Sequence, residues 1–365
     1  MNTILIITGT RPNFVKVTQF KKQVAKFPGW EVEIVHTGQH FDQNMSQVFF
    51  EQFKLVPDHF LNIEPGSPVS QMASIMQRLE KVVLERKPNV MMVVGDVNST
   101  LAGALVANKM SIPLAHLESG LRSNDRGMPE EINRILTDQI TNHFFITENS
   151  GMEHLLSEGK PADALHMVGN TMIDTLVAFQ EEIHASDILQ KLTVAPGEYA
   201  LMTIHRPATV DDSTRLKELV GLVRWICERI SVVFPIHPRT TSNLAKFGLQ
   251  EEFTSIPNLT LSEPMGYFDF QKLVADCRFV LTDSGGIQEE TTFLRKPCLT
   301  LRPNTERPVT ITEGTNVLIG DDWSRVPEEV ESIMEGTFKQ GAIPSLWDGE
   351  ATYRVLEVLT QQFGD

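Results

Sequence analysis

Short apolar runs alternate with amphipathic stretches along the whole chain. The amphipathic stretches repeat their apolar residues with the spacing of a helix, whereas the apolar runs have the length of buried strands. We expect strands at residues 4–8, 31–36, 90–95, 113–118, 143–147 and 166–169, and again at 200–205, 232–237, 259–262, 279–283, 298–301 and 316–319. Strands that alternate with helices are typical of parallel sheets built from βαβ units. The pattern therefore predicts an α/β protein.

The alternation is interrupted once, by a long helical stretch over 172–191 that ends in Val194-Ala195-Pro196-Gly197. Proline and glycine together mark a connection between elements. We therefore expect an N-terminal Rossmann-like domain at 1–170 and a C-terminal Rossmann-like domain at 171–348. A last amphipathic helix lies within about 349–365. The length of 365 residues suits two cores better than one.

One strand in the second half turns through glycines into a helix. The strand over 278–283 is followed by Ser284, Gly285 and Gly286, and then by a helical stretch over 287–294. Such a turn presents free backbone N–H groups and the positive end of a helix, which suits a phosphate. Glu290 falls in the inner stripe of this helix, where a carboxylate needs hydrogen-bond donors such as ribose hydroxyls. An ordinary turn capped by Ser284 is the alternative, but Glu290 together with Arg307, an arginine suited to a diphosphate, favours a nucleotide site.

Side chains capable of binding or catalysis follow six of the predicted strands. In open α/β sheets, ligands bind beyond the carboxyl ends of the strands. The six residues are Arg11, Asp96, Glu118, His205, His237 and Asp283. Each one alone is most simply a cap or a turn residue, yet six together favour a shared ligand. The two histidines could also transfer a proton near neutral pH.

Composition and charge narrow the possible partners. With 41% hydrophobic and 22% charged residues, the chain is typical of globular proteins. Its net charge of -15 argues against nucleic acid and anionic membranes, so an anionic ligand needs local arginines and helix ends. The three cysteines show no metal-binding spacing, and we expect no metal and no cofactor. The absence of a charged leader or a long apolar run predicts a cytoplasmic protein.

Ordered motifs along the chain resemble one enzyme family. They are GTRPNFVK at 9–16, TGQH at 37–40, GDVNST at 95–100, HLESGLR at 116–122, MPEEINR at 128–134, GNT at 169–171, HRP at 205–207 and LTDSGGIQEETT with LRPNTERPVT after 280. In this order, over nearly the whole chain, they resemble the non-hydrolysing UDP-N-acetylglucosamine 2-epimerases. The resemblance implies two doubly wound parallel-sheet domains facing one cleft, an architecture of glycosyltransferase-B type. It also implies a C-terminal helix that rejoins the first domain, and a homodimer.

The same resemblance implies a reaction and roles for residues. The reaction is reversible C2 epimerisation of UDP-N-acetylglucosamine to UDP-N-acetylmannosamine, by elimination and re-addition of UDP, for surface polysaccharide precursors. The expected catalytic residues are Asp96, Glu118, Glu130 and His205. The expected substrate-binding residues are Arg11, Lys16, Arg134, His237, Phe270, Ser284, Gly285, Gly286, Glu290 and Arg307.

Two of these assignments rest on a choice between interpretations. Glu130 is preferred to Glu131, with Arg134 orienting it at the i, i+4 spacing of a helix. As a plain helical ion pair, this contact would contribute only about 0.3–0.5 kcal/mol. Phe270 is expected beside the uracil ring, and a core phenylalanine is the alternative.

The chain departs from the family pattern at several positions. Asn13 stands where relatives usually have glutamate, and Pro207-Ala208-Thr209 differs from the usual run after the HR pair. Ile75 or Met76 stands at the place of the bacterial activator-site arginine, with Arg78 the nearest arginine, which predicts that substrate activation is lost. TGQHFDQNMS and SNDRGMPEE resemble a branch that includes epimerases of UDP-2,3-diacetamido-glucuronate. The alternatives are therefore that substrate, a hydrolysing epimerase, a glycosyltransferase or a non-catalytic UDP-sugar-binding protein.

Overall fold

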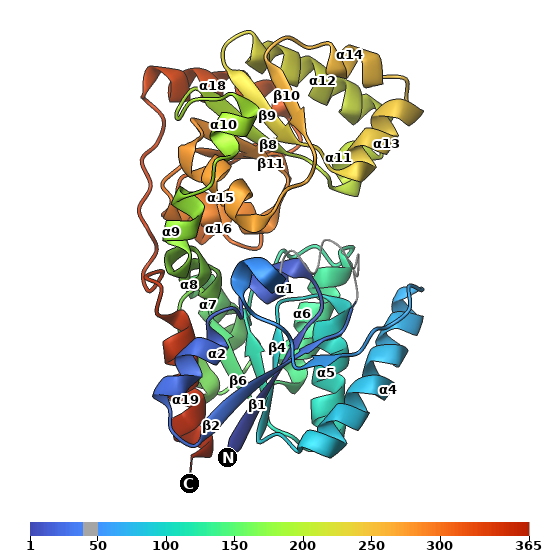
Figure 1. Cartoon of the computed structure of the whole chain (residues 1–365), viewed down its shortest axis with the longest axis vertical. Helices are drawn as coiled ribbons and strands as arrows, with labels where there is room; N and C mark the ends of the chain where they lie inside the picture. Colours follow the sequence, from blue (N-terminus) through green and yellow to red (C-terminus); the bar gives the residue numbers. More distant parts are fainter. Residues whose placement is uncertain (39–49, 365) are drawn as a thin grey trace. The chain divides into compact units, whose positions relative to one another are not determined.

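The computed structural model describes residues 1–38 and 50–364, and the chain divides into two compact units. Unit 1 comprises Met1–Ala178 and Ser345–Asp365, and unit 2 comprises Phe179–Pro344 (Figure 1). Gln39 and His40 of the TGQH motif lie outside the described residues.

Unit 1 contains a seven-stranded parallel sheet. Its strands are β1 (Asn2–Thr8), β2 (Trp30–His36), β3 (His59–Phe60), β4 (Val90–Val94), β5 (Leu114–Leu117), β6 (His143–Ile146) and β7 (Leu165–Met167). The strand order is β3-β2-β1-β4-β5-β6-β7. The chain direction across the sheet reverses between β1 and β4, and such a switch point is where open α/β sheets bind ligands. Only β3 was not expected, because two residues carry no periodic pattern.

Unit 2 contains a six-stranded parallel sheet of the same kind. Its strands are β8 (Tyr199–Thr203), β9 (Ser231–Pro235), β10 (Leu259–Ser262), β11 (Phe279–Thr282), β12 (Cys298–Thr300) and β13 (Asn316–Leu318). The order β10-β9-β8-β11-β12-β13 places the switch point between β8 and β11. The expected α/β class with two doubly wound parallel sheets is confirmed.

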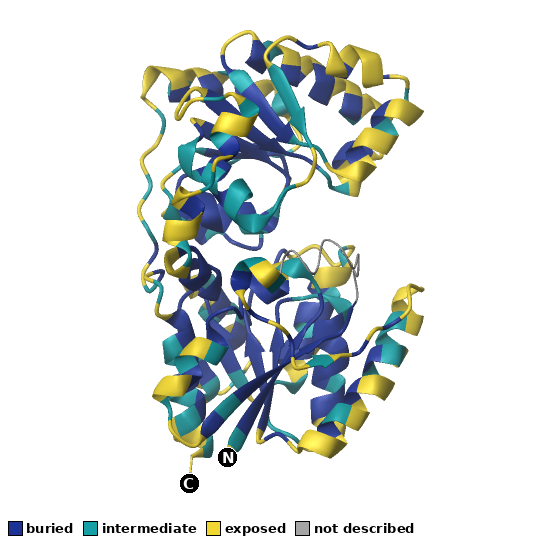
Figure 2. Cartoon of the chain, in the orientation of Figure 1, coloured by how far each residue is buried: buried dark blue, intermediate teal, exposed yellow. Residues whose placement is uncertain are grey.

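Helices cover both faces of each sheet, which explains the continuous apolar strands (Figure 2). In β11, Phe279 and Leu281 face one core with helix α12 (Ser213–Cys227), whereas Val280 faces a second core with helix α15 (Tyr267–Asp276). The two sides alternate because successive strand side chains point to opposite faces. Among the described residues, no helix combines the length and the apolarity that a membrane span requires.

The expected single helix over 172–191 is wrong, because the chain forms three short helices there. They are α8 (Thr171–Ala178), α9 (Gln180–His184) and α10 (Ile188–Leu192). The break before α10 is held by Ser186, whose hydroxyl donates to Asp269 at 2.5 Å and accepts from the N–H of Ile188 at 3.3 Å. Serine favours such local turns over a continuous helix.

The unit boundary lies after Ala178, beyond the expected position at residue 170. Helix α8 stays with unit 1 because Thr175 donates a hydrogen bond to the Val15 carbonyl at 2.5 Å. Asp174 in turn accepts N–H groups of Ala351 and Thr352, at 3.1 and 2.5 Å. These two residues begin α19 (Ala351–Phe363), which packs on α2 (Phe20–Gln23) and on α8 (Figure 1).

Candidate functional site

The first group of expected site residues lies at the carboxyl ends of β1, β4 and β5 in unit 1. Arg11 begins helix α1 (Arg11–Val15) and is half-buried. Lys16 follows α1, is buried, and forms an ion pair with the buried carboxylate of Glu118 after β5. Glu118 itself has a φ of +66°, a left-handed conformation that is uncommon for a residue with a side chain. Lys16 and Glu118 are thus brought together, with the carboxylate held in an unusual backbone turn.

Asp96 follows β4 and belongs to a second ion-paired set. Its half-buried carboxylate contacts the guanidinium of Arg134 on helix α6 (Pro129–Ile140). The other arm of Arg134 lies 2.9 Å from Glu131. Because both terminal nitrogens of Arg134 face carboxylates, the arginine fixes the position of Asp96 relative to α6.

The expectation that Arg134 orients Glu130 is wrong. Glu130 is exposed in the first turn of α6, whereas Glu131 is buried against Arg134. The carboxylate of Glu131 also accepts the N–H groups of Ser123 and Asn124, at 2.9 and 3.0 Å. Burial alone would raise the pKa of Glu131, but these hydrogen bonds and the Arg134 charge lower it below its ordinary value. The i, i+4 spacing misled here because tertiary partners, and not helix spacing, select the buried carboxylate.

A buried network behind these carboxylates was not expected from the sequence as a unit. His116 lies 2.7 Å from Asp138 through Nδ1 and 2.8 Å from the Gly95 carbonyl through Nε2. Asp138 also accepts the Gly120 N–H at 3.2 Å and lies 2.8 Å from Arg122. Burial would raise the pKa of Asp138, but His116 and Arg122 lower it. The network therefore fixes the two glycine turns that flank Asp96 and Glu118.

Asn13, the departure from the family pattern, has a structural role. Its side-chain oxygen accepts the Thr10 N–H at 3.3 Å, and its amide donates to the Val94 carbonyl at 3.2 Å. Asn13 thereby ties the turn after β1 to the end of β4. A carboxylate could not donate the second bond.

The activator-site positions in unit 1 also have structural roles. Ile75 lies on helix α4 (Pro68–Arg86) and is fully buried in a hydrophobic core of unit 1. Arg78 donates to the carbonyls of Leu61 and Asn62. The arginine nearest in sequence is thus committed to a backbone loop.

The second group of expected residues lies at the carboxyl ends of β8, β9 and β11 in unit 2. Asp283 is fully buried and accepts the N–H groups of His205 and Arg206, at 3.0 and 2.8 Å. The His205 ring lies 3.4 Å from Asp283 through Nδ1 and is 42% exposed, so one face stays open to a ligand. Its centroid lies 5.5 Å from that of His237.

His237 has a clear structural use. Its Nδ1 accepts the Arg239 N–H at 3.1 Å, which caps helix α13 (Pro238–Lys246). Burial lowers the pKa of His237, and the neighbouring His205 and Arg239 lower it further. A neutral ring with an acceptor at Nδ1 carries its proton on Nε2, so His237 can still donate one hydrogen bond.

The glycine turn begins helix α16 (Gly285–Phe293), as expected. Ser284 occupies the cap position, but its side chain makes no capping hydrogen bond. A Cβ atom at Gly285 would lie 2.8 Å from a Glu306 oxygen and 3.1 Å from an Arg307 nitrogen, so a larger residue there would displace these ion-paired side chains. The half-buried Gly286 follows in the first turn. Gln288 steadies the turn by donating to the Ser284 carbonyl at 3.1 Å.

Two arginines and two glutamates are buried beside this turn. Arg307 lies 2.8 Å from Glu289 and 2.6 Å from Glu306, and Arg302 lies 3.0 Å from Glu306. Arg307, the expected diphosphate contact, is therefore already engaged by two carboxylates.

Arg302 was not expected and offers a free donor. In the described part of the chain, its Nη1 atom is buried without a hydrogen-bond partner. This atom lies 3.6 Å from the Cβ position of Gly285. Burial lowers the pKa of Arg302 although Glu306 partly offsets this effect, so an acceptor for Nη1 would further stabilise the buried charge. The only hint in the sequence was an arginine directly after a strand.

Glu290 on α16 and Phe270 on α15 lie in unit 2. Burial raises the pKa of Glu290 to about 7, a hydrogen bond from Gln271 lowers it, and Glu289 raises it. Hydrogen-bond donors from a ligand would stabilise the charged form of this buried carboxyl group. Phe270, half-buried, packs on the core beside Leu273 and Ile287, which is the alternative considered for it. Among the described residues, no three His, Cys, Asp or Glu side chains gather as a metal site.

Comparisons with known proteins agree on one family. The model of the UDP-N-acetylglucosamine 2-epimerase family matches residues 22–360. A UDP-N-acetylglucosamine 2-epimerase from Methanocaldococcus jannaschii is 38% identical over 361 residues, which cover 97% of this chain and 98% of that protein. A UDP-2,3-diacetamido-2,3-dideoxy-D-glucuronate 2-epimerase from Pseudomonas aeruginosa is 37% identical over 362 residues, covering 98% and 99%.

A solved structure gives the same result. The crystal structure of the Methanocaldococcus jannaschii UDP-GlcNAc 2-epimerase in complex with UDP-GlcNAc and UDP has a TM-score of 0.89 to this chain. It is 36% identical, and the match covers 99% of this chain and 100% of that one.

Proposed function

The chain belongs to the UDP-N-acetylglucosamine 2-epimerase family, and from this premise we propose that it interconverts UDP-N-acetylglucosamine and UDP-N-acetylmannosamine. The observation that carries the proposal is the placement of Asp96 and Glu118. These carboxylates follow the neighbouring strands β4 and β5, and each contacts a buried cation. Carboxylates so positioned can accept and return a proton at a substrate carbon.

The unit 2 group is proposed to bind the UDP moiety. The N–H groups at the start of α16, which Ser284 does not cap, and the Nη1 of Arg302, unpartnered among the described residues, suit the diphosphate. Glu290 is proposed to accept ribose hydroxyls, and Phe270 to lie beside the uracil ring. Arg307 stays a predicted diphosphate ligand, and Arg307→Ala should weaken UDP binding in a calorimetric titration.

The proposed reaction breaks the C1–O bond to UDP and the C2–H bond together. A base removes the C2 proton, the C2–H electrons form a C1=C2 double bond, and UDP leaves with the C1–O electrons. Re-addition of UDP at C1 then accompanies protonation of C2 from the opposite face. Asp96, Glu118 and His205 are the proposed proton carriers, with Arg11 and Lys16 as nearby cations. Glu130 stays a prediction, and its exposed position in α6 leaves it free to contact substrate.

A second candidate substrate is UDP-2,3-diacetamido-2,3-dideoxyglucuronate, because a relative named for that substrate is 37% identical. Its C6 carboxylate would need an added cation, for which Arg126 and Arg206 are the candidates. The main chain of Arg206 is fixed by Asp283, while the residue itself is half-buried. Comparing turnover of the two UDP-sugars decides between them.

The decisive experiment for the reaction is an incubation in deuterium oxide. With UDP-N-acetylglucosamine as substrate, both UDP-sugars should acquire deuterium at C2, as read by proton NMR. Epimerised product that carries only protium would refute elimination and re-addition. Release of free N-acetylmannosamine would instead indicate a hydrolysing epimerase, and binding of both candidate UDP-sugars without conversion of either would indicate a non-catalytic protein. The expected homodimer, cytoplasmic location and role in surface polysaccharide synthesis stay predictions.

A further inference from the structure

A basic cavity lies in unit 2 at the sheet edge opposite to the glycine turn. Its volume is about 480 Å³, which is within the range of small-molecule sites. Its lining includes residues just before two strands, namely Arg278 before β11 and Lys296 and Pro297 before β12. Ser284–Gly286 follow the carboxyl end of β11, whereas this cavity lies at the amino ends of β11 and β12. The basic cavity is therefore distinct from the proposed UDP site.

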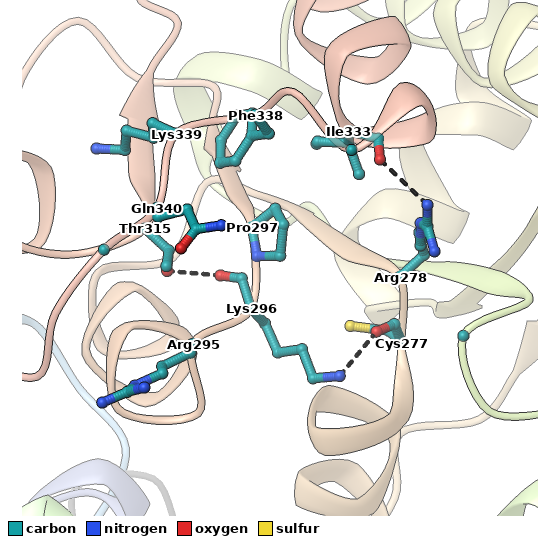
Figure 3. A pocket seen from close by; sticks show the side chains of 13 residues that line it. Cys277, Arg278, Arg295, Lys296, Pro297, Thr315, Ile333, Phe338, Lys339 and Gln340 are labelled. Carbon is teal, nitrogen blue, oxygen red and sulfur yellow. Dashed lines mark hydrogen bonds between the residues drawn. The ribbon is translucent and has the colours of Figure 1, made fainter.

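Four cationic side chains line the basic cavity, namely Arg278, Arg295, Lys296 and Lys339, and its lining contains no aspartate or glutamate. This is unusual in a chain with a net charge of -15. Figure 3 shows Arg278 and Lys296 at one end of the cavity and Arg295 and Lys339 at the other. A hollow lined by one sign of charge concentrates the field and attracts counter-ions.

The hydrogen bonds of these cations go to neutral carbonyl groups. Lys296 donates to Cys277 at 3.2 Å, and Lys339 donates to Ile311 at 2.8 Å. Arg278 donates to two carbonyls in the last turn of helix α18 (Val326–Glu335), at 3.3 Å each. Among the described residues, none of the four cations forms an ion pair with a carboxylate. Each can thus still offer N–H groups to an anion.

Two carboxylates near the cavity, those of Asp276 and Glu329, have other cationic partners. Asp276, beside Cys277, lies 2.9 Å from Lys272. Glu329, whose charge acts on Lys339, lies 3.9 Å from Arg325. Burial lowers the pKa of Lys339, and a bound anion beside it would stabilise its charged form.

The wall between the cations is apolar and held in place. Phe338 and Pro297 lie between the two ends of the cavity (Figure 3). Backbone hydrogen bonds anchor Phe338 to Ser332 at 3.1 Å, and Ala342 to Glu313 at 2.7 Å. Apolar walls with a few convergent polar groups are typical of sites for small organic ligands.

We propose that the basic cavity is a second ligand site, which binds a small organic phosphate. The cations would contact the phosphate group, and Phe338 with Pro297 would contact the organic part. Arginine and lysine are the usual phosphate ligands in proteins. The proposal does not depend on the epimerase reaction, because it uses no residue of the proposed active site.

The test measures acetylation of individual lysines in the full-length protein by mass spectrometry. The probe is 5′-AMP, with inorganic phosphate and adenosine in parallel and ionic strength held constant. At about ten times its dissociation constant, 5′-AMP should slow acetylation of Lys296 and Lys339 about tenfold. Lys217 on α12, exposed in the same unit, is the internal reference and should not change. Adenosine should give no protection.

Comparison of the two phosphate probes identifies the source of binding. Tighter protection by 5′-AMP than by phosphate supports an organic ligand, whereas equal protection assigns the site to free phosphate. No protection of Lys296 and Lys339 by either probe at millimolar concentration would overturn the proposal.

A matched pair of variants controls for general electrostatics. Arg295→Gln removes an exposed cavity cation and leaves both reporter lysines in place. Arg224→Gln removes another exposed arginine, which pairs with Glu252 away from the cavity, at 2.9 Å. Arg295→Gln should raise the 5′-AMP concentration for half-protection by about three- to tenfold. An equal shift in both variants would show that only net charge matters, and would overturn the proposal.

Discussion

Replacing Arg302 by lysine should weaken UDP binding strongly. In the described structure, Arg302 is 4% exposed, and its Nη1 has no hydrogen-bond partner beside the start of α16. A hydrogen bond from a charged donor contributes about 1.5–3 kcal/mol. Lysine keeps the charge next to Glu306, which lies 3.0 Å away, but lacks the planar fork that reaches a second partner. We therefore expect the dissociation constant for UDP to rise by about 10- to 150-fold.

The assay is isothermal titration of UDP into the wild-type protein, Arg302→Lys and the control Arg224→Lys. The control changes an exposed arginine of unit 2 outside the glycine turn and should bind UDP normally. Thermal melting without ligand establishes that each variant is folded. A folded Arg302→Lys protein that binds UDP within about twofold of wild type would show that Nη1 does not face the diphosphate.

Three further predictions concern the proposed catalytic residues, the buried carboxyl group of Glu290 and activation by substrate. Asp96→Asn, Glu118→Gln and His205→Ala should each lower turnover strongly while UDP still binds, and normal turnover in one of them would make that residue structural. Glu290, whose pKa burial raises from 4.5 to about 7, should contribute stability that is complete below about pH 4.5 and is lost as the pH rises through about 7. In the wild-type protein, this effect should lower the free energy of unfolding by up to about 3 kcal/mol between about pH 5 and pH 8. Glu290→Gln should not show this decrease in urea unfolding, and an unchanged pH dependence in the variant would contradict the prediction. Because Ile75 packs in the core, rate curves should be hyperbolic without an activator, and a sigmoidal curve would contradict that reading.

Local sequence pattern was sufficient for most of the fold. Strands buried on both faces need continuous apolar runs, and turns into helices need glycine or a capping residue. Both features can therefore be recognised from a few consecutive residues of the sequence. Ser284, Gly285 and Gly286 therefore lie where the pattern placed them, at the start of α16. The same holds for Asp96 and His205. Each lies just after a strand whose end was predictable from its apolar run.

The choice between neighbouring residues depended on partners far along the chain. Glu131 is selected over Glu130 because Ser123 and Asn124 donate to it from another segment. Helix spacing carries no information about such donors. Similarly, the break after α9 depends on Asp269, which lies 83 residues from Ser186.

The same reason explains the residues that sequence reasoning missed. Arg302 became a candidate only when its buried, unpartnered nitrogen was found beside Gly285. Lys296 and Arg278 look like ordinary residues before strands, and only the parallel alignment of β11 and β12 brings them to one cavity. The sequence by itself determined the class of fold and the strand ends that bear the chemistry. The tertiary structure alone decided which charges are paired, because ion pairing depends on distances that local pattern does not encode.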